Sequence, residues 1–286
     1  MAYQIITDNC CDMEPAMYEK LGVTVINLTL LYKGAEHRNM DEPFLKELYN
    51  GMRSGEAATT SAVNPEGWAS VIEPALEKGD DALVLAFSSG LSTTYQSAVI
   101  AATDLQDKYP ERKILVVDTL CASLGQGLLL WYVCKKRDQG YSLEQLAEYC
   151  TELVPKLSHW FTVDDLMFLK RGGRISAATA LVGTMLQIKP VLHVDDEGHL
   201  VSVAKARGRK ASIEALAKKL GETGLPGENE TVFICHGDCI EDAKYLENLV
   251  KEKYGVKEVY TYYTGGVIGS HSGPGTLALF FLGSQR

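Results

Sequence analysis

A short, wholly apolar segment that is followed at once by a polar turn and a helix constrains the fold of this chain more than any other feature. The segment Ala82–Phe87 does not alternate between polar and apolar side chains, which is typical of a strand buried on both faces of a parallel sheet. It ends in Ser88-Ser89-Gly90, and a helix is expected over Thr93–Lys108. This order of strand, turn and helix predicts a βαβ unit.

The same alternation runs through the first half of the chain. Strands are expected at Tyr3–Thr7, Val23–Leu31, Ala82–Phe87 and Ile114–Val117, and helices at Glu14–Leu21, Pro43–Met52, Pro65–Glu77 and Thr93–Lys108. Two further helices follow, and the second begins at Ser142, which forms a capping-box pattern with Gln145. The first half is therefore predicted to be an α/β domain with a mostly parallel sheet.

The pattern changes near residue 158. Extended segments at Trp160–Val163 and Leu166–Leu169 precede a turn at 170–174 and a helix near Ser176–Leu186. A hairpin of Lys189–Val194 and Leu200–Ala204 is expected next, followed by a helix at Lys210–Leu220. Strands at Thr231–Cys235 and Val259–Tyr263 flank a helix at Glu241–Tyr254, and a last helix begins at Thr276. We expect a second α/β or α+β domain, with domains 1–158 and 159–286 packing directly on each other.

Composition excludes several classes of protein. A chain of 286 residues with a formal net charge of −9 argues against a nucleic-acid binder, which usually needs a basic face. The longest apolar stretch, Leu128–Cys134, is too short to span a membrane, and the first residues have no signal-peptide pattern. We therefore expect a soluble, cytoplasmic protein.

Cysteines and glycines point to no metal or nucleotide site. The seven cysteines are odd in number and irregular in spacing, so reduced thiols are expected. Cys235 and Cys239 flank His236, but no second ligand pair with zinc spacing occurs, so no metal site is predicted. The first strand is not followed by G-x-G-x-x-G, and neither a Walker A motif nor a G-x-S-x-G elbow occurs. Gly125-x-Gly127 is interpreted as a site of close helix packing.

Two clusters of hydroxyl side chains are candidates for anion binding. Ser92-Thr93-Thr94 opens a helix, whose unpaired N–H groups and positive dipole end suit an anion. With neutral hydroxyls and no Lys or Arg among them, a carboxylate fits better than a polyphosphate. Thr59-Thr60-Ser61 can supply a further donor if both clusters lie at the carboxyl ends of parallel strands. The alternative is ordinary capping, by Ser89 or Ser92 in the first cluster.

A glycine-rich segment and a basic group complete the candidate residues. His271 stands in the middle of residues 265–276, which hold five glycines and a proline, so the backbone there is expected to be shaped for a close approach. The alternative is a solvated loop histidine. Lys170, Arg171 and Arg174, with the basic residues of 205–210, form a positive island in an acidic protein, or else a solvated surface.

Short motifs in a fixed order carry a resemblance to a known family. The motifs are Thr7-Asp8; Thr60-Ser61; Ser88-Ser89-x-Leu91-Ser92-x-Thr94-Tyr95-Gln96-Ser97-Ala98; Gly172-Gly173-Arg174-Ile175; Ile188-Lys189-Pro190; Arg207-Gly208; His236-Gly237-Asp238; and Val267-Ile268-Gly269-x-His271-x-Gly273-Pro274-Gly275-Thr276. The chain resembles the DegV family, which includes the bacterial fatty-acid-binding FakB proteins, from about residue 3 to residue 281.

The resemblance implies a non-catalytic lipid-binding protein. In that family a long-chain fatty acid lies in an apolar tunnel between two domains, and a separate fatty acid kinase converts it to an acyl phosphate for phospholipid synthesis. By motif match, Thr60 and Ser92 would bind the carboxylate with His271 beside it, and Arg207 would contact the kinase. Ser61, Thr93 and Arg174 are expected in supporting positions. The fatty acid is the ligand and no cofactor is implied. Transient contact with a membrane surface is compatible with this role.

Three of the motifs depart from the family pattern, at five positions in all. Asn9-Cys10 stands where a serine pair is common, and Ala62-Val63 where Gln-Pro is usual. Thr93 replaces a common glycine, which adds a Cβ and a hydroxyl beside the expected carboxylate.

Two other functions compete with fatty acid binding. A serine- and histidine-dependent lipid hydrolase or acyltransferase would use Ser92 and His271, with Asp8 or Asp238 orienting the histidine. A purely protein-binding module would hold no small molecule.

Overall fold

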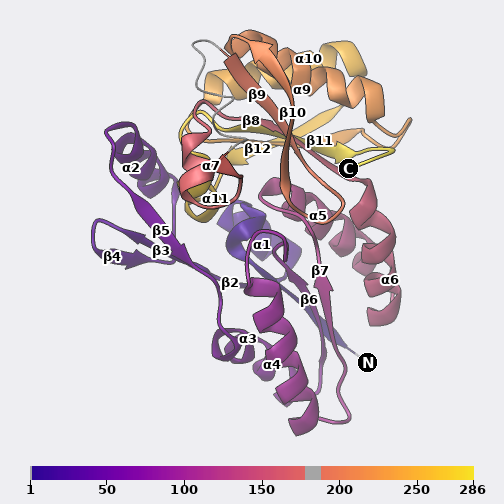
Figure 1. Cartoon of the computed structure of the whole chain (residues 1–286). Coiled ribbons are helices and arrows are strands. Elements are labelled where there is room, and N and C mark those ends of the chain that lie inside the picture. Colours follow the sequence, from indigo (N-terminus) through magenta and orange to yellow (C-terminus); the bar gives the residue numbers. More distant parts are fainter. Residues whose placement is uncertain (1, 178–187) are drawn as a thin grey trace.

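Three β-sheets organise the chain in the computed structural model, which describes residues 2–177 and 188–286 (Figure 1). A four-stranded sheet belongs to the first half, a six-stranded sheet to the second, and a three-stranded sheet joins them. The predicted α/β class, with a parallel first sheet and a second mixed sheet, is confirmed.

The first sheet has the strand order β2-β1-β6-β7, and all its neighbours are parallel. These strands are β1 (Tyr3–Asp8), β2 (Thr24–Ile26), β6 (Asp81–Ala86) and β7 (Ile114–Asp118). Every residue of β6 is buried, and five of its six residues, Ala82–Ala86, belong to the apolar segment that predicted the strand. Leu83 and Leu85 pack toward helices α5 (Leu124–Asp138) and α6 (Leu143–Leu153). Val84 and Ala86 pack toward α3 (Pro65–Glu77) and α4 (Thr94–Lys108), so helices cover both faces.

The second sheet has the strand order β10-β9-β8-β13-β11-β12. Its strands are β8 (Leu157–Thr162), β9 (Ile188–Val194), β10 (Leu200–Arg207), β11 (Thr231–His236), β12 (Glu258–Tyr263) and β13 (Leu277–Leu282). Helices α9 (Arg209–Thr223) and α10 (Ile240–Tyr254) cover one face. The other face turns toward α5, and Phe161 and Phe280 share one hydrophobic cluster with Leu128 of that helix. This face positions the site described below.

The third sheet is small and antiparallel, with the order β4-β3-β5. Its strands are β3 (Thr29–Tyr32), β4 (Ala35–His37) and β5 (Ala58–Ser61). It packs with α2 (Glu42–Arg53) and α11 (Gly266–Ser272), and Leu30 shares a core cluster with Tyr263. A segment near the start of the chain is thereby held against a helix near its end.

The prediction of one continuous strand over Val23–Leu31 is wrong. The chain divides it into β2 and β3, which belong to different sheets. The break falls at Leu28, whose N–H donates to Asn9 Oδ1 at 2.9 Å instead of to a neighbouring strand. Alternation of side chains cannot reveal such a change of partner, because both pieces keep an extended backbone.

Three further expectations near the C-terminal half are wrong. Leu166–Leu169 was expected to be extended, but most of it lies in the short helix α7 (Met167–Arg171). Thr276 precedes strand β13 and not a helix, because Leu277–Leu282 is buried between β8 and β11. A short apolar run fits a buried strand or a buried helix equally well.

His271 lies in α11 and not in a loop. The helix expected at 176–186 falls largely outside the described residues.

Other local predictions are confirmed. The helix at Pro65–Glu77 has the predicted bounds, and Ser142 and Gln145 form a capping box. Gly125 packs so closely on the His159 ring that a Cβ would collide with it. The remaining short helices are η1 (Asn9–Cys11), α1 (Pro15–Leu21) and η2 (Val154–Lys156). The predicted domain boundary near residue 158 falls within β8, and it remains a prediction.

The described part of the chain contains neither a membrane-spanning helix nor a cluster of metal ligands. Every helix there is too short or too polar to cross a lipid bilayer. Within residues 2–177 and 188–286, no group of three or more His, Cys, Asp or Glu side chains is arranged to hold a metal ion. The seven cysteines are free thiols, and all but Cys239 are buried.

Candidate functional site

A cavity of about 470 Å³ lies between the first unit and the face of the second sheet that turns toward it. Phe87 and Leu91 line it from the first half of the chain, and Phe161, Leu200 and Phe280 line it from the second. Its volume and mostly apolar wall are typical of sites for small organic molecules. Because both halves contribute, the cavity exists only when the two units pack together.

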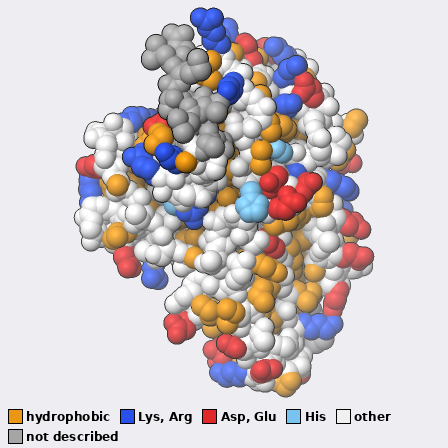
Figure 2. Space-filling view, viewed as in Figure 1, with side chains coloured by type: hydrophobic (Ala, Val, Ile, Leu, Met, Phe, Trp, Pro, Cys, Tyr) orange, Lys and Arg blue, Asp and Glu red, His pale blue; other side chains and the backbone are white. Residues whose placement is uncertain are grey.

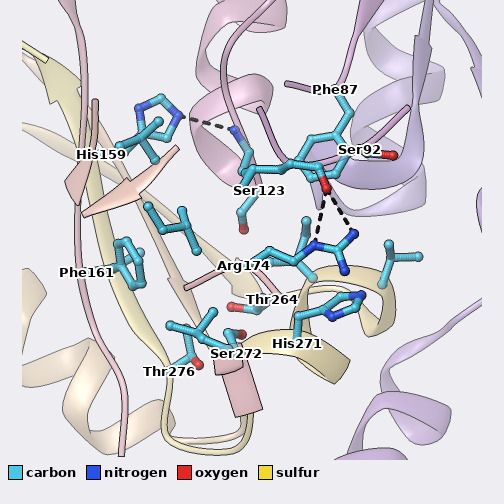
Figure 3. Close-up of a pocket in the computed structure, with 18 of the residues that line it drawn as sticks. Phe87, Ser92, Ser123, His159, Phe161, Arg174, Thr264, His271, Ser272 and Thr276 are labelled. Carbon is cyan, nitrogen blue, oxygen red and sulfur yellow. Dashed lines mark hydrogen bonds between the residues drawn. The ribbon is translucent and has the colours of Figure 1, made fainter. Parts of the chain in front are cut away.

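Four polar side chains gather on the cavity wall in what we call the outer cluster: Thr60, Ser92, Arg174 and His271. Figure 3 shows the last three of them. Thr60 lies on β5, Ser92 precedes α4, Arg174 follows α7 and His271 is on α11. Thr60 Oγ1 is 2.8 Å from His271 Nε2, although 211 residues separate them in sequence. All four side chains are partly exposed.

Thr60 reaches this cluster by a route that differs from the expected one. We expected it at the carboxyl end of a parallel strand, but it lies within β5 of the antiparallel three-stranded sheet. Contact between β5 and α11 brings its hydroxyl to the histidine. Ser61, the next residue, is exposed and lies off the cavity wall, since successive side chains of a strand point to opposite faces.

Ser92 both faces the cavity and helps to begin helix α4. Its hydroxyl oxygen accepts the Thr94 N–H at 3.2 Å and lies 2.8 Å from Thr94 Oγ1. The N-cap of α4 is Thr93, which makes no side-chain capping hydrogen bond, so the alternative of an N-cap at Ser89 or Ser92 is wrong. Ser92 instead contacts the first residue of the helix from its place on the cavity wall. Thr93 is exposed and also lines the cavity, so the side chain that replaces the family's common glycine is within reach of a ligand.

Burial and a neighbouring cation keep His271 neutral. Burial, and then the positive charge of Arg174, lower its pKa to about 4. The backbone of Gly172 lies so close to the imidazole that a Cβ there would collide with Nδ1, so only glycine allows this approach. At neutral pH the histidine therefore offers one N–H donor and one acceptor nitrogen.

Arg174 connects the two halves of the chain at the cavity. Its Nε and Nη2 donate to the Leu91 carbonyl at 3.2 and 2.9 Å (Figure 3). Burial lowers its pKa, but an arginine stays charged at physiological pH. The outer cluster thus combines neutral hydroxyls with one fixed positive charge, which suits a single carboxylate.

The basic island of the sequence divides into paired and unpaired residues. Arg209 Nε lies 2.8 Å from Asp242 Oδ2, and Arg209 Nη1 lies 3.7 Å from Asp164 Oδ1. Arg207, at the end of β10, is exposed, off the cavity wall and without a side-chain partner in the described part of the chain. Figure 2 shows Lys and Arg side chains in the upper part of the molecule, over α7 and the β9–β10 strands.

A second polar group on the cavity wall, the inner cluster, consists of Ser123, Cys235, Thr264 and Ser272. Thr264 Oγ1 donates to Cys235 Sγ at 3.1 Å. Ser123 Oγ lies 3.2 Å from the same sulfur and 2.5 Å from Asp12 Oδ2. Sequence analysis did not single out this cluster as a ligand site, because isolated hydroxyls and a cysteine carry no motif.

A nucleophilic site is not assembled among the described residues. Ser92 is hydrogen-bonded to Thr94, whereas His271 is hydrogen-bonded to Thr60. Asp8 accepts the N–H groups of Cys10 and Phe87, and Asp238 is paired with Arg53. A serine nucleophile needs a base within hydrogen-bond reach, and within the described part of the chain Ser92 Oγ contacts Thr94 and no such base. The geometry therefore favours binding over hydrolysis.

A parallel sheet and a mixed sheet with an apolar, ligand-sized cavity between them define a two-unit α/β binding fold. The chain belongs to the DegV family, whose sequence model matches residues 2–284. A DegV domain-containing protein of Clostridium perfringens is 42% identical over 286 residues, covering 99% of this chain and 98% of the relative.

Solved structures of the same fold are known. A DegV family protein from Thermus thermophilus, described by its fatty acid binding, is 33% identical, with a TM-score of 0.88 and coverage of 99% of this chain and 100% of its own. A protein from Eubacterium ventriosum, described as binding stearic acid, is 25% identical, with a TM-score of 0.87 and coverage of 98% of both chains. The structural neighbours are thus DegV proteins that bind fatty acids.

Proposed function

We propose that this protein binds one long-chain fatty acid in the cavity between domains 1–158 and 159–286 and presents its carboxylate to a separate fatty acid kinase. The observation that carries the proposal is an apolar cavity with the partly exposed outer cluster on its wall. The fatty acids bound by the Thermus and Eubacterium neighbours support the same ligand class.

The alkyl chain supplies most of the affinity. Burial of each methylene contributes about 0.8 kcal/mol, so a chain of about sixteen carbons contributes on the order of 12 kcal/mol before the cost of association. The wall residues Phe87, Phe161 and Phe280 offer the apolar surface for this burial.

The outer cluster orients the headgroup. When the His271 Nε2–H donates to Thr60 Oγ1, the Thr60 hydroxyl is free to donate to a carboxylate oxygen, and the histidine fixes its orientation. The Ser92 hydroxyl is a second donor on the same wall, and Arg174 supplies a compensating charge. A hydrogen bond to a charged group contributes about 1.5–3 kcal/mol. Thr93 and Arg174 have supporting roles from the same wall, whereas the exposed Ser61 serves as a matched control.

Presentation requires that the carboxylate be reachable from outside. At the kinase, a carboxylate oxygen attacks the γ-phosphorus of ATP, which yields an acyl phosphate for phospholipid synthesis and releases ADP. The outer cluster is partly exposed, and Arg207 is exposed and has no side-chain partner within residues 2–177 and 188–286, so its guanidinium can contact the kinase. This protein supplies binding and orientation without a chemical step of its own, and the role fits the cytoplasmic location expected from the sequence.

Extraction of the purified protein with solvent, followed by lipid mass spectrometry, tests the binding proposal. We expect about one long-chain fatty acid per chain, directly or after loading. No retained fatty acid after loading would overturn the proposal.

A kinase assay tests presentation separately. Arg207→Ala should keep fatty acid binding but lower acyl-phosphate formation about tenfold, as expected when a contact residue of an interface is truncated. Lys244→Ala, which removes an exposed cation on α10, is the control and should leave the rate unchanged. An unchanged rate with Arg207→Ala would refute its role at the kinase interface.

A further inference from the structure

We propose that the inner cluster recognises a hydroxyl group on the bound acyl chain, so that hydroxylated long-chain fatty acids bind more tightly than plain ones of the same length. This inference rests on the proposed fatty acid binding and names the subclass of ligand. It is carried by Ser123, Thr264 and Ser272, which surround the cavity in Figure 3.

The inner cluster is more deeply buried than a headgroup site needs to be. Ser123 is 5% exposed, Ser272 is 4% exposed, and Thr264 and Cys235 are 0% and 1% exposed. A plain alkyl chain can form no hydrogen bond with these groups, and it would exclude the water that otherwise could. Buried polar groups are costly unless they are paired, so this wall is poorly matched to a fully saturated ligand.

Ser272 is the decisive residue. Its hydroxyl has no hydrogen-bond partner among the residues the structure describes, although it is almost completely buried and lines the cavity. Its neighbours differ: Ser270 Oγ donates to the Val267 carbonyl, and Thr276 Oγ1 donates to the Gly273 carbonyl, both at 2.8 Å. The same segment therefore satisfies the other buried hydroxyls internally and leaves one donor for a group in the cavity.

The other members supply the acceptors. Thr264 directs its proton to Cys235 Sγ, and Ser123 lies within hydrogen-bond distance of Asp12 and Cys235, so both oxygens retain lone pairs. A ligand hydroxyl can accept from Ser272 and donate to Ser123 or Thr264. Both of its hydrogen-bonding capacities are then used, as a buried hydroxyl requires.

Charge distinguishes a hydroxyl from a second carboxylate. The two ionisable groups in direct contact with Ser123 are the Asp12 carboxyl and the Cys235 thiol, neither of which can be a cation, and among the described residues no Lys or Arg side chain hydrogen-bonds to a member of the inner cluster. A dicarboxylic acid would bring a negative charge toward Asp12 with no cation to offset it. The cluster therefore fits a neutral hydroxyl on the chain, while the outer cluster takes the carboxylate.

Competitive binding of matched acids to the full-length protein tests this subsite. The probes are stearate and a series of hydroxystearates with the hydroxyl at successive mid-chain carbons. We expect at least one hydroxystearate to bind about tenfold more tightly than stearate. In Ser272→Ala this preference should fall to about twofold or less while stearate affinity is retained, and Ser61→Ala should keep the wild-type ratio.

The outcomes separate the two proposals. If the wild-type protein binds stearate but prefers no hydroxystearate, the hydroxyl subsite is refuted and the fatty acid proposal stands. If it binds neither acid, the fatty acid proposal itself fails. If Ser272→Ala does not fold, the wild-type ratios still decide, and Ser272→Cys, which keeps only a weak donor, should give an intermediate preference.

Discussion

The outer and inner clusters use similar side chains in different surroundings. Both contain neutral hydroxyls and both draw on the two halves of the chain. The outer cluster is partly exposed and includes Arg174, whereas the inner cluster is buried and adjoins the carboxyl of Asp12. Burial and the sign of the nearest charge, more than residue type, therefore determine which part of an amphipathic ligand each cluster suits.

The largest expected effect comes from blocking the space that the two clusters share. Ala278 of β13 lines the cavity and is 4% exposed. Ala278→Phe should place a ring in this space and weaken fatty acid binding by more than about hundredfold, because the chain loses its buried surface. Titration with a fluorescent fatty acid measures this loss. Ala35→Phe on the exposed strand β4 is the control, and equal losses in the two variants would argue against the cavity as the site.

Truncation of the outer cluster should weaken headgroup binding alone. Ser92→Ala removes a donor to the carboxylate, so stearate affinity should fall about tenfold to hundredfold, which corresponds to about 1.5–3 kcal/mol. The methyl ester of stearic acid carries no charge, and its affinity should change much less. A calorimetric titration of both ligands makes the comparison. Equal losses for acid and ester would show that Ser92 contributes packing and not carboxylate recognition.

His271 of the outer cluster and Asp12 beside the inner cluster should make the free energy of unfolding depend on pH in opposite directions. The pKa of His271 is about 4 in the folded protein and 6.5 in an unfolded chain, so the unfolded state binds a proton first as the pH falls. Stability is therefore lost below pH 6.5, by about 2 kcal/mol between pH 6.5 and pH 5. Burial raises the pKa of Asp12 to about 7, so its contribution is full at low pH and is lost as the pH rises toward 7.

Urea unfolding at pH 5 and pH 6.5 measures these slopes. The two contributions oppose each other in this range. Compared with the wild type, His271→Gln should shift the free energy of unfolding in favour of pH 5 over pH 6.5. Asp12→Asn should shift it in favour of pH 6.5 over pH 5. Ser272→Ala titrates no group and should keep the wild-type slope. Parallel slopes in His271→Gln and the wild type would show that the histidine is not held neutral by burial.

Prediction from sequence succeeded where structure depends on neighbours along the chain. The apolar run of β6 and the capping box at Ser142 are local signals, and each is confirmed. The ordered motifs also identified the family, and they selected Thr60, Ser92 and His271, which line one cavity. Their roles toward a ligand remain predictions.

Prediction failed where an apolar or extended segment has alternative partners. Residues 23–31 were interpreted as one strand, yet two sheets share them, and the last strand was interpreted as a helix. The free energy that decides such cases comes from long-range packing, which the pattern of one segment does not contain.

The sequence by itself determined the buried β6 strand, the helix that begins beside Ser92 and the membership of the chain in the DegV family. Only the tertiary structure decided that Thr60 contacts His271, that Ser61 turns away, and that Ser123 from the first half meets Cys235 and Thr264 from the second. The physical reason is that strand patterns and helix caps are set by adjacent residues. Which side chains line the same cavity depends on how the two sheets pack on either side of α5, because that packing decides whether each hydroxyl is buried or exposed.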